Sequence, residues 1–216
     1  MAFTLPNGTT ISIASTYGSS TVTTSVSNAT EAVAALTSAT GFSAGGIVEV
    51  TSGWSKLDRR IARVKTLVSL NATLESVDTS STTKFPSGSG VGSARPISAW
   101  TQISQITEIT SDGGTQGFAT YSTIDDTTER QIPTNKSAMS LKLKVGDDVS
   151  LPHYALLVAA DDDKLPRAIR AVLPNNSIIF YNCFVSINKT PSLTKDQVMV
   201  LDVTLSLVSD VTRYAS

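Results

Sequence analysis

The sequence predicts an all-β protein with one short helix. Ser, Thr, Val, Ile and Ala are abundant among its 216 residues, and only 16% of the residues are charged. Short runs of β-branched residues recur along the chain and are separated by residues that favour turns. Stretches with the 3.6-residue periodicity of amphipathic helices are scarce. A chain of this length can bury a substantial core, and the grouping of the runs favours two modules, 1–90 and 91–216.

The first module contains short extended runs that predict a small β-barrel of about five strands. The runs are Thr21–Val26, Ala32–Thr37, Ile47–Thr51, Ile61–Val68 and Ala72–Val77. One alternative stays open, because Asn28 and Glu31 have the spacing of a helix capping box and Val33 and Leu36 would share a helical face. The segment TTKFPSGSGVGSARP is rich in Gly and Ser and predicts a linker, so we place the module boundary near Gly90.

The second module begins with extended segments and then a polar loop. The loop, Ser122–Lys136, contains little that could be buried, so we expect it to be mobile in the isolated chain. The strand expected next, Ser137–Val145, alternates between two faces. Its core face would carry Met139, Leu141, Leu143 and Val145, and its wet face Ser140, Lys142 and Lys144.

A short helix is expected at 152–162. Ser150 is suited to the N-cap position, and Pro152 to the first helical position, where its missing N–H costs nothing. The apolar residues from Tyr154 to Ala160 continue the helix. The run Asp161–Asp163 disfavours further helix, because the C-terminal end of a helix already carries partial negative charge.

A hairpin and a closing strand complete the expected fold. The chain should be extended from Arg167 to Leu173, turn at 174–176 and return through 178–187. Both faces of the returning strand are mostly apolar, so it needs a core on one face and a helix or another subunit on the other. In the last strand, Met199–Leu207, apolar residues alternate with Asp202, Thr204 and Ser206, which predicts one wet face.

This order of elements resembles the major tail tube proteins of bacteriophages with long, non-contractile tails. The similar segments after the expected helix are LPRAIRAVLPNNSIIFYNCFVSINKTPSLT and VMVLDVTLSLVSDVTRY; those before it are WTQISQITEIT, SDGGTQG, FATYSTIDD and SAMSLKLKV. The resemblance implies a tail-tube β-sandwich or barrel core, subunits joined in hexameric rings, and rings stacked into a tube. It also implies a structural protein with no enzymatic activity.

The first module carries a second resemblance. The segments VSNATEAVAALTSATGFSAGGIVEVTSGWSKLDRRIARVK and ATLESVDTS are similar to a small β-barrel module of phage virion proteins. They are also similar to the first catalytic-cysteine half-domain of ubiquitin-activating enzymes, a barrel that performs no catalysis itself. Both similarities imply an accessory module, which would decorate the outside of the tube.

The tail tube resemblance suggests two groups of residues for assembly. The strand at 137–145 would join the inner wall of the ring, with Ser140, Lys142 and Lys144 on its wet face. Lumen walls in this family tend to be acidic or neutral, so both lysines would have to point elsewhere or be paired. The polar loop would become ordered on the adjacent ring, although a plain flexible hairpin loop is the alternative. Its candidate contact residues are Asp125, Asp126, Glu129 and Arg130.

The implied partners are other copies of the chain, a tape-measure protein, and tail terminator and tail-tip proteins. DNA would pass through the lumen without specific binding, and the net charge of −1 also argues against a protein that grips phosphates. The segment MAFTLPNGTT does not resemble a signal peptide, and no run reaches the roughly 18 apolar residues of a membrane span. We therefore expect no membrane contact, assembly in the bacterial host cytoplasm, and residence in the virion tail.

Residues that could support catalysis or bind metals are scarce, so we expect no catalytic, cofactor or metal site. Ser150, His153 and a downstream aspartate could compose a triad, but no nucleophile motif surrounds any serine. The acidic pairs and triplets lack the spacing of a calcium loop. Cys183 is the only cysteine and is expected to pack as an apolar residue.

The rival function is glycan or host binding at the tail tip, with Trp54, Trp100 and Tyr121 in a surface groove.

Overall fold

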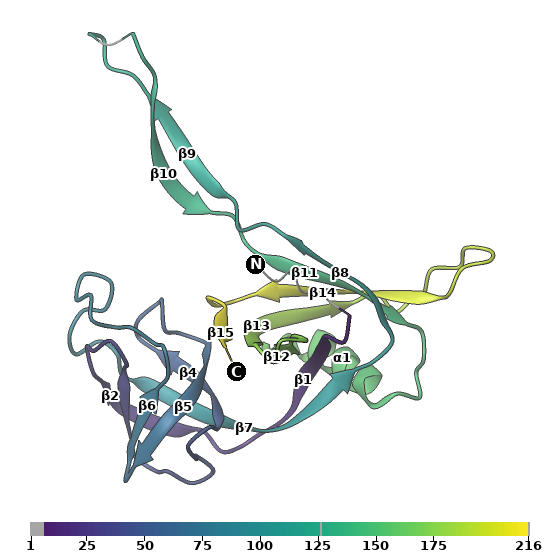
Figure 1. Ribbon diagram of the computed structural model, residues 1–216, viewed down its shortest axis with the longest axis horizontal. Helices are drawn as coiled ribbons and strands as arrows, with labels where there is room; N and C mark the ends of the chain where they lie inside the picture. The colour runs from purple at the N-terminus through teal and green to yellow at the C-terminus, as the bar shows by residue number, and fades with distance from the viewer. Residues whose placement is uncertain (1–6, 126, 216) are drawn as a thin grey trace.

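The computed structural model describes residues 7–125 and 127–215. The chain forms a small closed barrel and a larger curved sheet, and a long hairpin projects from the larger sheet (Figure 1). The described residues contain one helix, α1 (Pro152–Asp163), and are otherwise dominated by strands. The prediction of an all-β fold with one short helix is confirmed.

Six strands of the described chain close the small barrel. Their order is β2, β3, β6, β5, β4 and β7, and β7 pairs with β2 to complete the circle. Their bounds are β2 (Thr21–Val26), β3 (Val33–Leu36), β4 (Ile47–Ser52), β5 (Arg60–Val68), β6 (Asn71–Leu74) and β7 (Gly92–Ile103). Each of the five expected runs overlaps a strand. The alternative capping box does not form, because the Asn28 amide donates to the carbonyls of Thr79 and Phe85, both at 2.9 Å.

The Gly/Ser-rich segment before β7 packs against the barrel and does not behave as a linker. Phe85 is buried and meets the ring of Trp54 edge-on, with 5.3 Å between ring centroids. The indole N–H of Trp54 donates to the carbonyl of Pro86 at 2.8 Å. A Cβ at Gly90 would lie 2.8 Å from the Trp54 ring, so glycine is needed for the close approach. Gly90, which suggested flexibility in the sequence, therefore serves close packing on a tryptophan.

The larger sheet has the strand order β7, β1, β12, β13, β14, β11 and β8, and every pairing is antiparallel. The additional bounds are β1 (Thr10–Tyr17), β8 (Ile106–Asp112), β11 (Ser140–Gly146), β12 (Arg167–Val172), β13 (Ile178–Ile187) and β14 (Val200–Leu207). Ile11 and Ile103 at one end of this order share a core cluster with Leu143 and Val145 near the other end. The sheet therefore curls around its core, which Leu157 and Ala160 of α1 also enter.

The strand pairing crosses the expected module boundary near Gly90. β1 precedes the barrel strands in the sequence but pairs with β12 and β7 in the larger sheet. The first part of β7 pairs with β4 and β2 in the barrel, and its second part pairs with β1. The two parts thus share a strand, and whether 1–90 and 91–216 behave as separate domains stays a prediction.

Buried polar contacts also join the barrel to the larger sheet. Glu49 of β4 is 6% exposed and accepts from Arg95 Nε at 2.7 Å and from Asn182 Nδ2 of β13 at 3.0 Å. Asn182 also donates to the carbonyl of Arg59 at 2.7 Å. The short C-terminal strand β15 (Thr212–Tyr214) pairs with β13 and brings Tyr214 to the barrel. There the Tyr214 hydroxyl accepts from the backbone N–H of Arg63 at 2.8 Å.

The core face of β13 is largely buried, and its other face is covered only in the first half of the strand, since Phe184 and Ser186 are exposed. Cys183, Val185 and Ile187 lie in the core beside α1, whereas Phe180 packs with Ile61 of the barrel. The second cover was expected to be a helix or another subunit, and the structure corrects this for the first half of the strand, where the cover is the chain's own barrel.

The helix and its hairpin form where they were expected, with one correction at the N-cap. The N-cap residue is Leu151, and the Ser150 hydroxyl instead donates to Asp148 Oδ1 at 2.6 Å. Pro152 takes the first helical position, and Lys164 ends the helix in a left-handed conformation with φ of 55°. The turn between β12 and β13 contains Asn176 with φ of 61°, a conformation that asparagine tolerates.

The projecting hairpin, which we call the arm, consists of β9 (Gln116–Tyr121) and β10 (Arg130–Lys136). Its strands pair only with each other among the described residues, and Figure 1 shows them extending away from both the barrel and the larger sheet. The expectation of a loop throughout Ser122–Lys136 was wrong for β10. Its sequence RQIPTNK has no apolar alternation, because every residue of β10 is exposed.

Candidate assembly interface

Four neighbouring strands, β13, β14, β11 and β8, present a continuous wet face, which we call the wall. Leu141, Leu143 and Val145 of β11 point into the core, whereas Lys142 and Lys144 are exposed and Ser140 is half-buried on the opposite face. In register across the wall, Phe184 lies beside Ser206, Ser140 and Asp112, and Ser186 lies beside Thr204, Lys142 and Thr110. The alternation read from the sequence of β11 is therefore present, except that Met139 lies outside the strand.

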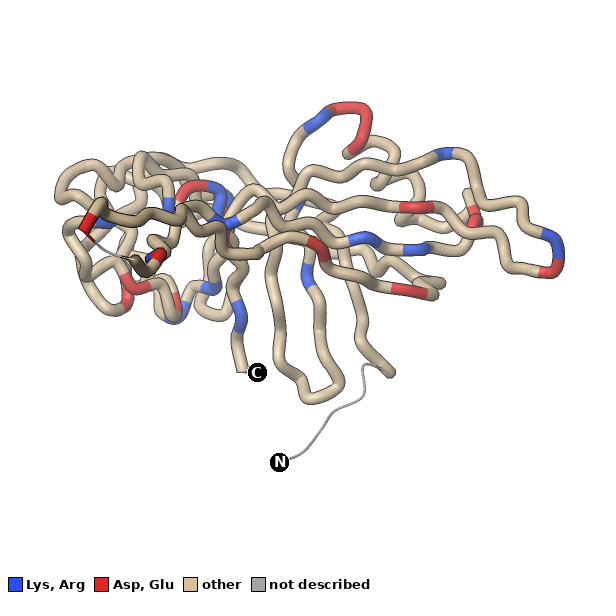
Figure 2. The backbone as a smooth tube through the Cα atoms, turned by 90° about the horizontal axis from the view of Figure 1, so that it is seen from above, with Lys and Arg blue, Asp and Glu red and all other residues tan. Residues whose placement is uncertain are grey.

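The lysines of the wall are paired with carboxylates. Lys144 Nζ lies 2.6 Å from Glu108 Oε2, and Lys142 Nζ lies 3.5 Å from Asp112 Oδ2. The hydrogen bond from Lys144 to Glu108 raises the pKa of Lys144. Asp202 lies next to Lys144, so the strands β14, β11 and β8 together carry three carboxylates and two lysines. Over the whole molecule, Lys and Arg lie interspersed with Asp and Glu and do not gather on one side (Figure 2).

One edge of the wall is the open strand β8. Its only partner among the described strands is β11, and every residue of β8 after Ile106 is exposed, including Ile109 at 45%. An open strand edge offers unpaired N–H and C=O groups to another strand. β8 carries no proline that would obstruct such pairing.

The opposite edge of the wall is the end of β13. β14 pairs with β13 from Cys183 to Ile187, whereas the pairing with β12 stops at Arg167 and Cys183. The segment 184–187 thus has a partner on one side in the described chain. Because the four strands alternate in direction, β8 and β13 run in opposite directions. A second copy placed beside β8 through its β13 would therefore pair antiparallel.

The arm exposes several large apolar side chains to solvent. Phe118 is 56% exposed, Tyr121 44% and Ile132 53%, and Ile124 at the tip is fully exposed. An isolated two-stranded hairpin is marginally stable in water, so the arm has stability to gain from a partner surface.

The expected stacking residues lie at the far end of the arm. A hydrogen bond from the Thr123 side chain lowers the pKa of Asp125. Glu129 is exposed beside Arg130, which begins β10 opposite Tyr121. Asp126 lies outside the described residues. The structure therefore places Asp125, Glu129 and Arg130 in or beside the turn that connects β9 to β10.

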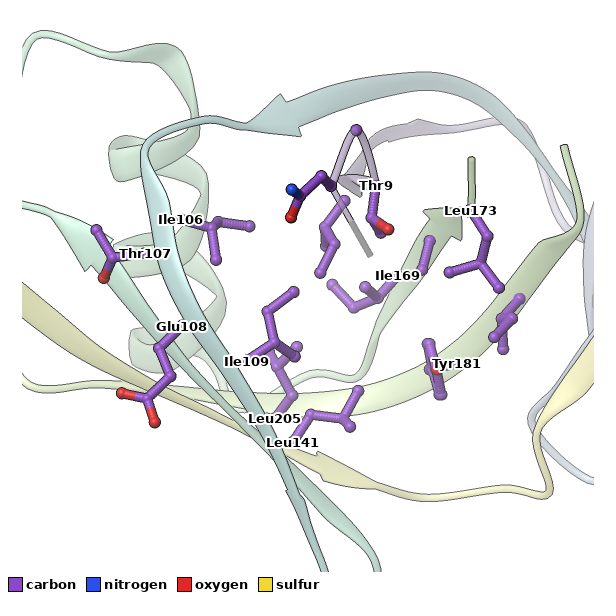
Figure 3. A pocket seen from close by; sticks show the side chains of 15 residues that line it. Thr9, Ile106, Thr107, Glu108, Ile109, Leu141, Ile169, Leu173, Tyr181 and Leu205 are labelled. Atoms are coloured by element: carbon purple, nitrogen blue, oxygen red, sulfur yellow. The ribbon is translucent and has the colours of Figure 1, made fainter. Parts of the chain in front are cut away.

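An apolar groove opens beside β8 on the core side of the sheet, with a volume of about 520 Å³. Ile106 and Ile109 of β8 line it together with Leu141, Ile169 and Tyr181 from across the sheet. Figure 3 shows these apolar side chains around the groove, while Thr107 and Glu108 point away from it. Sequence reasoning missed this groove and the edge β8. A one-residue irregularity between β8 and β11, next to Gln105 with φ of 59°, hides the alternation of the two isoleucines.

Residues with possible chemical roles are occupied by packing or pairing. His153 is 2% exposed, and burial lowers its pKa. Ion pairs join Asp161 to Lys164 and Asp162 to Lys189, and Arg167 pairs with Asp163. Burial raises the pKa of Cys183 to about 12. Within the described residues no group of three or more His, Cys, Asp or Glu side chains is placed to hold a metal ion.

The aromatic residues of the glycan-binding hypothesis do not meet in a groove. Trp54 is 2% exposed inside the barrel. Trp100 packs against Phe180 with 5.9 Å between ring centroids, and the guanidinium of Arg170 lies 4.9 Å from the centre of its ring. Tyr121 lies on the arm. Both tryptophans therefore have packing roles in the fold.

Comparison with known proteins gives one informative result. A family model described as phage tail tube protein, TTP, matches residues 52–216. No curated protein matches the chain. In the part of the chain that the structure describes, no helix is long and apolar enough to cross a membrane.

Proposed function

The chain belongs to the phage tail tube proteins, and from this premise we propose that it forms hexameric rings through the two open edges of its wall. As a member of this family it is a structural protein of the virion tail that assembles with itself into a tube. In the proposed ring, β8 of each subunit pairs with the end of β13 of its neighbour. The wall strands of all subunits then make one antiparallel barrel around the lumen.

The observation that carries this proposal is the pair of open edges with opposite strand directions. Such edges join head to tail, and a rotation that closes on itself leaves no strand unpaired. Ring closure would thus remove the exposed edge of β8, which otherwise invites uncontrolled association. The number six comes from the resemblance to tail tubes.

The charges of the wall support a lumen that conducts DNA without holding it. Lysines facing a lumen would bind phosphates, but Glu108 and Asp112 neutralise Lys144 and Lys142. The remaining carboxylate of Asp202 makes this surface slightly acidic. DNA would therefore slide past during ejection, after the tape-measure protein has left the lumen.

The arm is proposed to join one ring to the next. Its exposed apolar residues and its length beyond the sheet suit contact with the adjacent ring, where the tip with Asp125, Asp126, Glu129 and Arg130 would become ordered. We further propose assembly in the host cytoplasm around a tape-measure protein, with terminator and tip proteins at the two tube ends. The barrel would lie on the outside.

Electron microscopy of the purified protein tests the ring. We expect six-fold rings or hollow filaments at concentrations where subunits associate. A protein that remains monomeric at high concentration, with its fold intact, would contradict the proposal.

Deleting Ile124–Pro133 tests the arm separately from the ring. We expect rings to form and long filaments to be lost, because the wall edges are untouched while the stacking contact is removed. Electron microscopy of both proteins, prepared in parallel, gives the distribution of filament lengths. Filaments of unchanged length would show that the arm has no role in stacking.

A further inference from the structure

The apolar groove beside β8 is an unfilled part of the core of the larger sheet. Leu157 and Ala160 of α1 fill part of the core inside the curled sheet. On the same core side, no described residue fills the groove, and Ile109 is 45% exposed within it. Exposed apolar surface of this kind is typical of sites that another protein segment or a ligand covers.

The groove is continuous with the edge through which the ring is proposed to close. Ile106 and Ile109 belong to β8, so a neighbour that pairs with β8 comes to lie next to their core-facing side chains. The chain segment that fills the groove should therefore be one that flanks the end of β13 in the neighbouring subunit.

Leu165 is an exposed apolar residue in the connection between α1 and β12. Lys189, two residues after β13, reaches Asp162 of α1 with 3.1 Å between Nζ and Oδ1, and Arg167 is in register with Cys183. These contacts place the connection from α1 to β12 beside the open segment 184–187. Leu165 is 56% exposed there.

The local backbone holds Leu165 in a defined position. Lys164 adopts a left-handed conformation with φ of 55°, and the N–H of Leu165 donates to Asp163 Oδ1 at 2.8 Å. Pro166 follows and restricts Leu165 to extended conformations. An exposed leucine on a fixed connection can be buried by a partner at a low entropic cost.

We propose that Leu165 of each subunit docks into the β8 groove of its neighbour, beside Ile106 and Ile109. This inference rests on the proposed ring and adds to it a specific apolar contact on the core side of the joined sheets. The backbone pairing of β8 with β13 is tolerant of sequence, whereas the leucine in the groove makes the contact between subunits specific.

Disulfide cross-linking tests the contact directly. A variant with both Ile109→Cys and Leu165→Cys should give, under mild oxidation, a ladder of covalent oligomers up to six subunits on a non-reducing gel. An equal mixture of the two single variants should stop at dimers. Background from Cys183 is low, because burial raises the pKa of its thiol to about 12 and keeps it protonated.

A substitution series gives an independent readout. Leu165→Asp should raise the protein concentration needed for ring formation at least tenfold, and Leu165→Met should restore assembly. Val68→Asp is the matched control, since Val68 is 69% exposed on the barrel, away from the wall. Thermal unfolding of the isolated subunits should be alike for all variants, because Leu165 and Val68 are both exposed there.

The outcomes separate this inference from the proposed ring. Rings in the parent protein, no ladder from the double cysteine variant and normal assembly of Leu165→Asp would overturn the inference alone. If, in addition to these results, the thiol of Ile109→Cys were protected from maleimide in the rings, another segment would occupy the groove. That outcome also overturns the inference. Failure of the parent protein to form rings would instead contradict the proposed function.

Discussion

Single residues in this protein are constrained mainly by burial. His153 lies in the first turn of α1, is 2% exposed, and has its pKa lowered because burial disfavours the charged imidazolium. The nearby carboxylate of Asp148 acts in the opposite sense but is the smaller influence. The neutral ring is therefore part of the folded state, and its protonation opposes folding.

We expect acidification below about pH 6.5, the ordinary pKa of histidine, to lower the free energy of unfolding. As the pH falls, His153 is protonated in the unfolded chain before it is protonated in the folded protein. The free energy of unfolding is therefore highest above that pH, and it declines as the pH falls toward the lowered pKa of the folded state. The slope is at most about 1.4 kcal/mol per pH unit. Urea unfolding between pH 7 and 5 measures it, and His153→Gln should remove the decline. An equal decline in the variant would assign it to other groups.

At the scale of elements, the arm depends on the glycines at its base. Gly113 has φ of +84°, and a Cβ there would lie 1.8 Å from the carbonyl oxygen of Ala138. The strand β11 begins two residues after Ala138. Any side chain at Gly113 must therefore push the arm away from the wall.

We expect Gly113→Ala to cost about 2 kcal/mol or more and to impair filament formation. A positive φ alone costs an alanine about 1 kcal/mol, and the backbone clash adds to it. Gly88→Ala is the matched control, because Gly88 has φ of +79° and a Cβ added there would meet no other atom within 4 Å. Chemical denaturation and electron microscopy compare the two. Equal effects of both substitutions would mean that the backbone around Gly113 can move to accommodate the added Cβ without cost.

Strands with one buried and one wet face could be read from the sequence most directly. Leu141 and Leu143 of β11 alternate visibly with Lys142, and the same holds for β14. β10 could not be read, because a strand with no buried face has no alternation. The edge β8 and the cover of Phe180 were also hidden, since both depend on strands distant in the sequence.

At the scale of the whole molecule, the barrel and the larger sheet are joined by a shared strand and by buried polar contacts. They share β7, and the buried carboxylate of Glu49 is satisfied from both parts by Arg95 and Asn182. A buried charge that loses a partner destabilises a fold strongly. The two parts should therefore unfold together.

We expect Asn182→Ala to lower the free energy of unfolding by about 2–4 kcal/mol, because Glu49 and the Arg59 carbonyl each lose a donor. Ser186→Ala on the exposed side of the same strand should change it by less than about 0.5 kcal/mol. Calorimetry should show a single transition for the parent protein. Two resolved transitions would mean that the barrel is independently stable.

The path of the chain through β1 and β7 has a consequence for the history of the gene. Tyr17, where the chain leaves the larger sheet, is in register with Ile97, where it returns. The whole barrel therefore lies between Tyr17 and Ile97 in the sequence, and these two residues are neighbours in the pairing of β1 with β7. A segment with this entry and exit can be acquired, exchanged or lost in a single recombination event without rerouting any other strand.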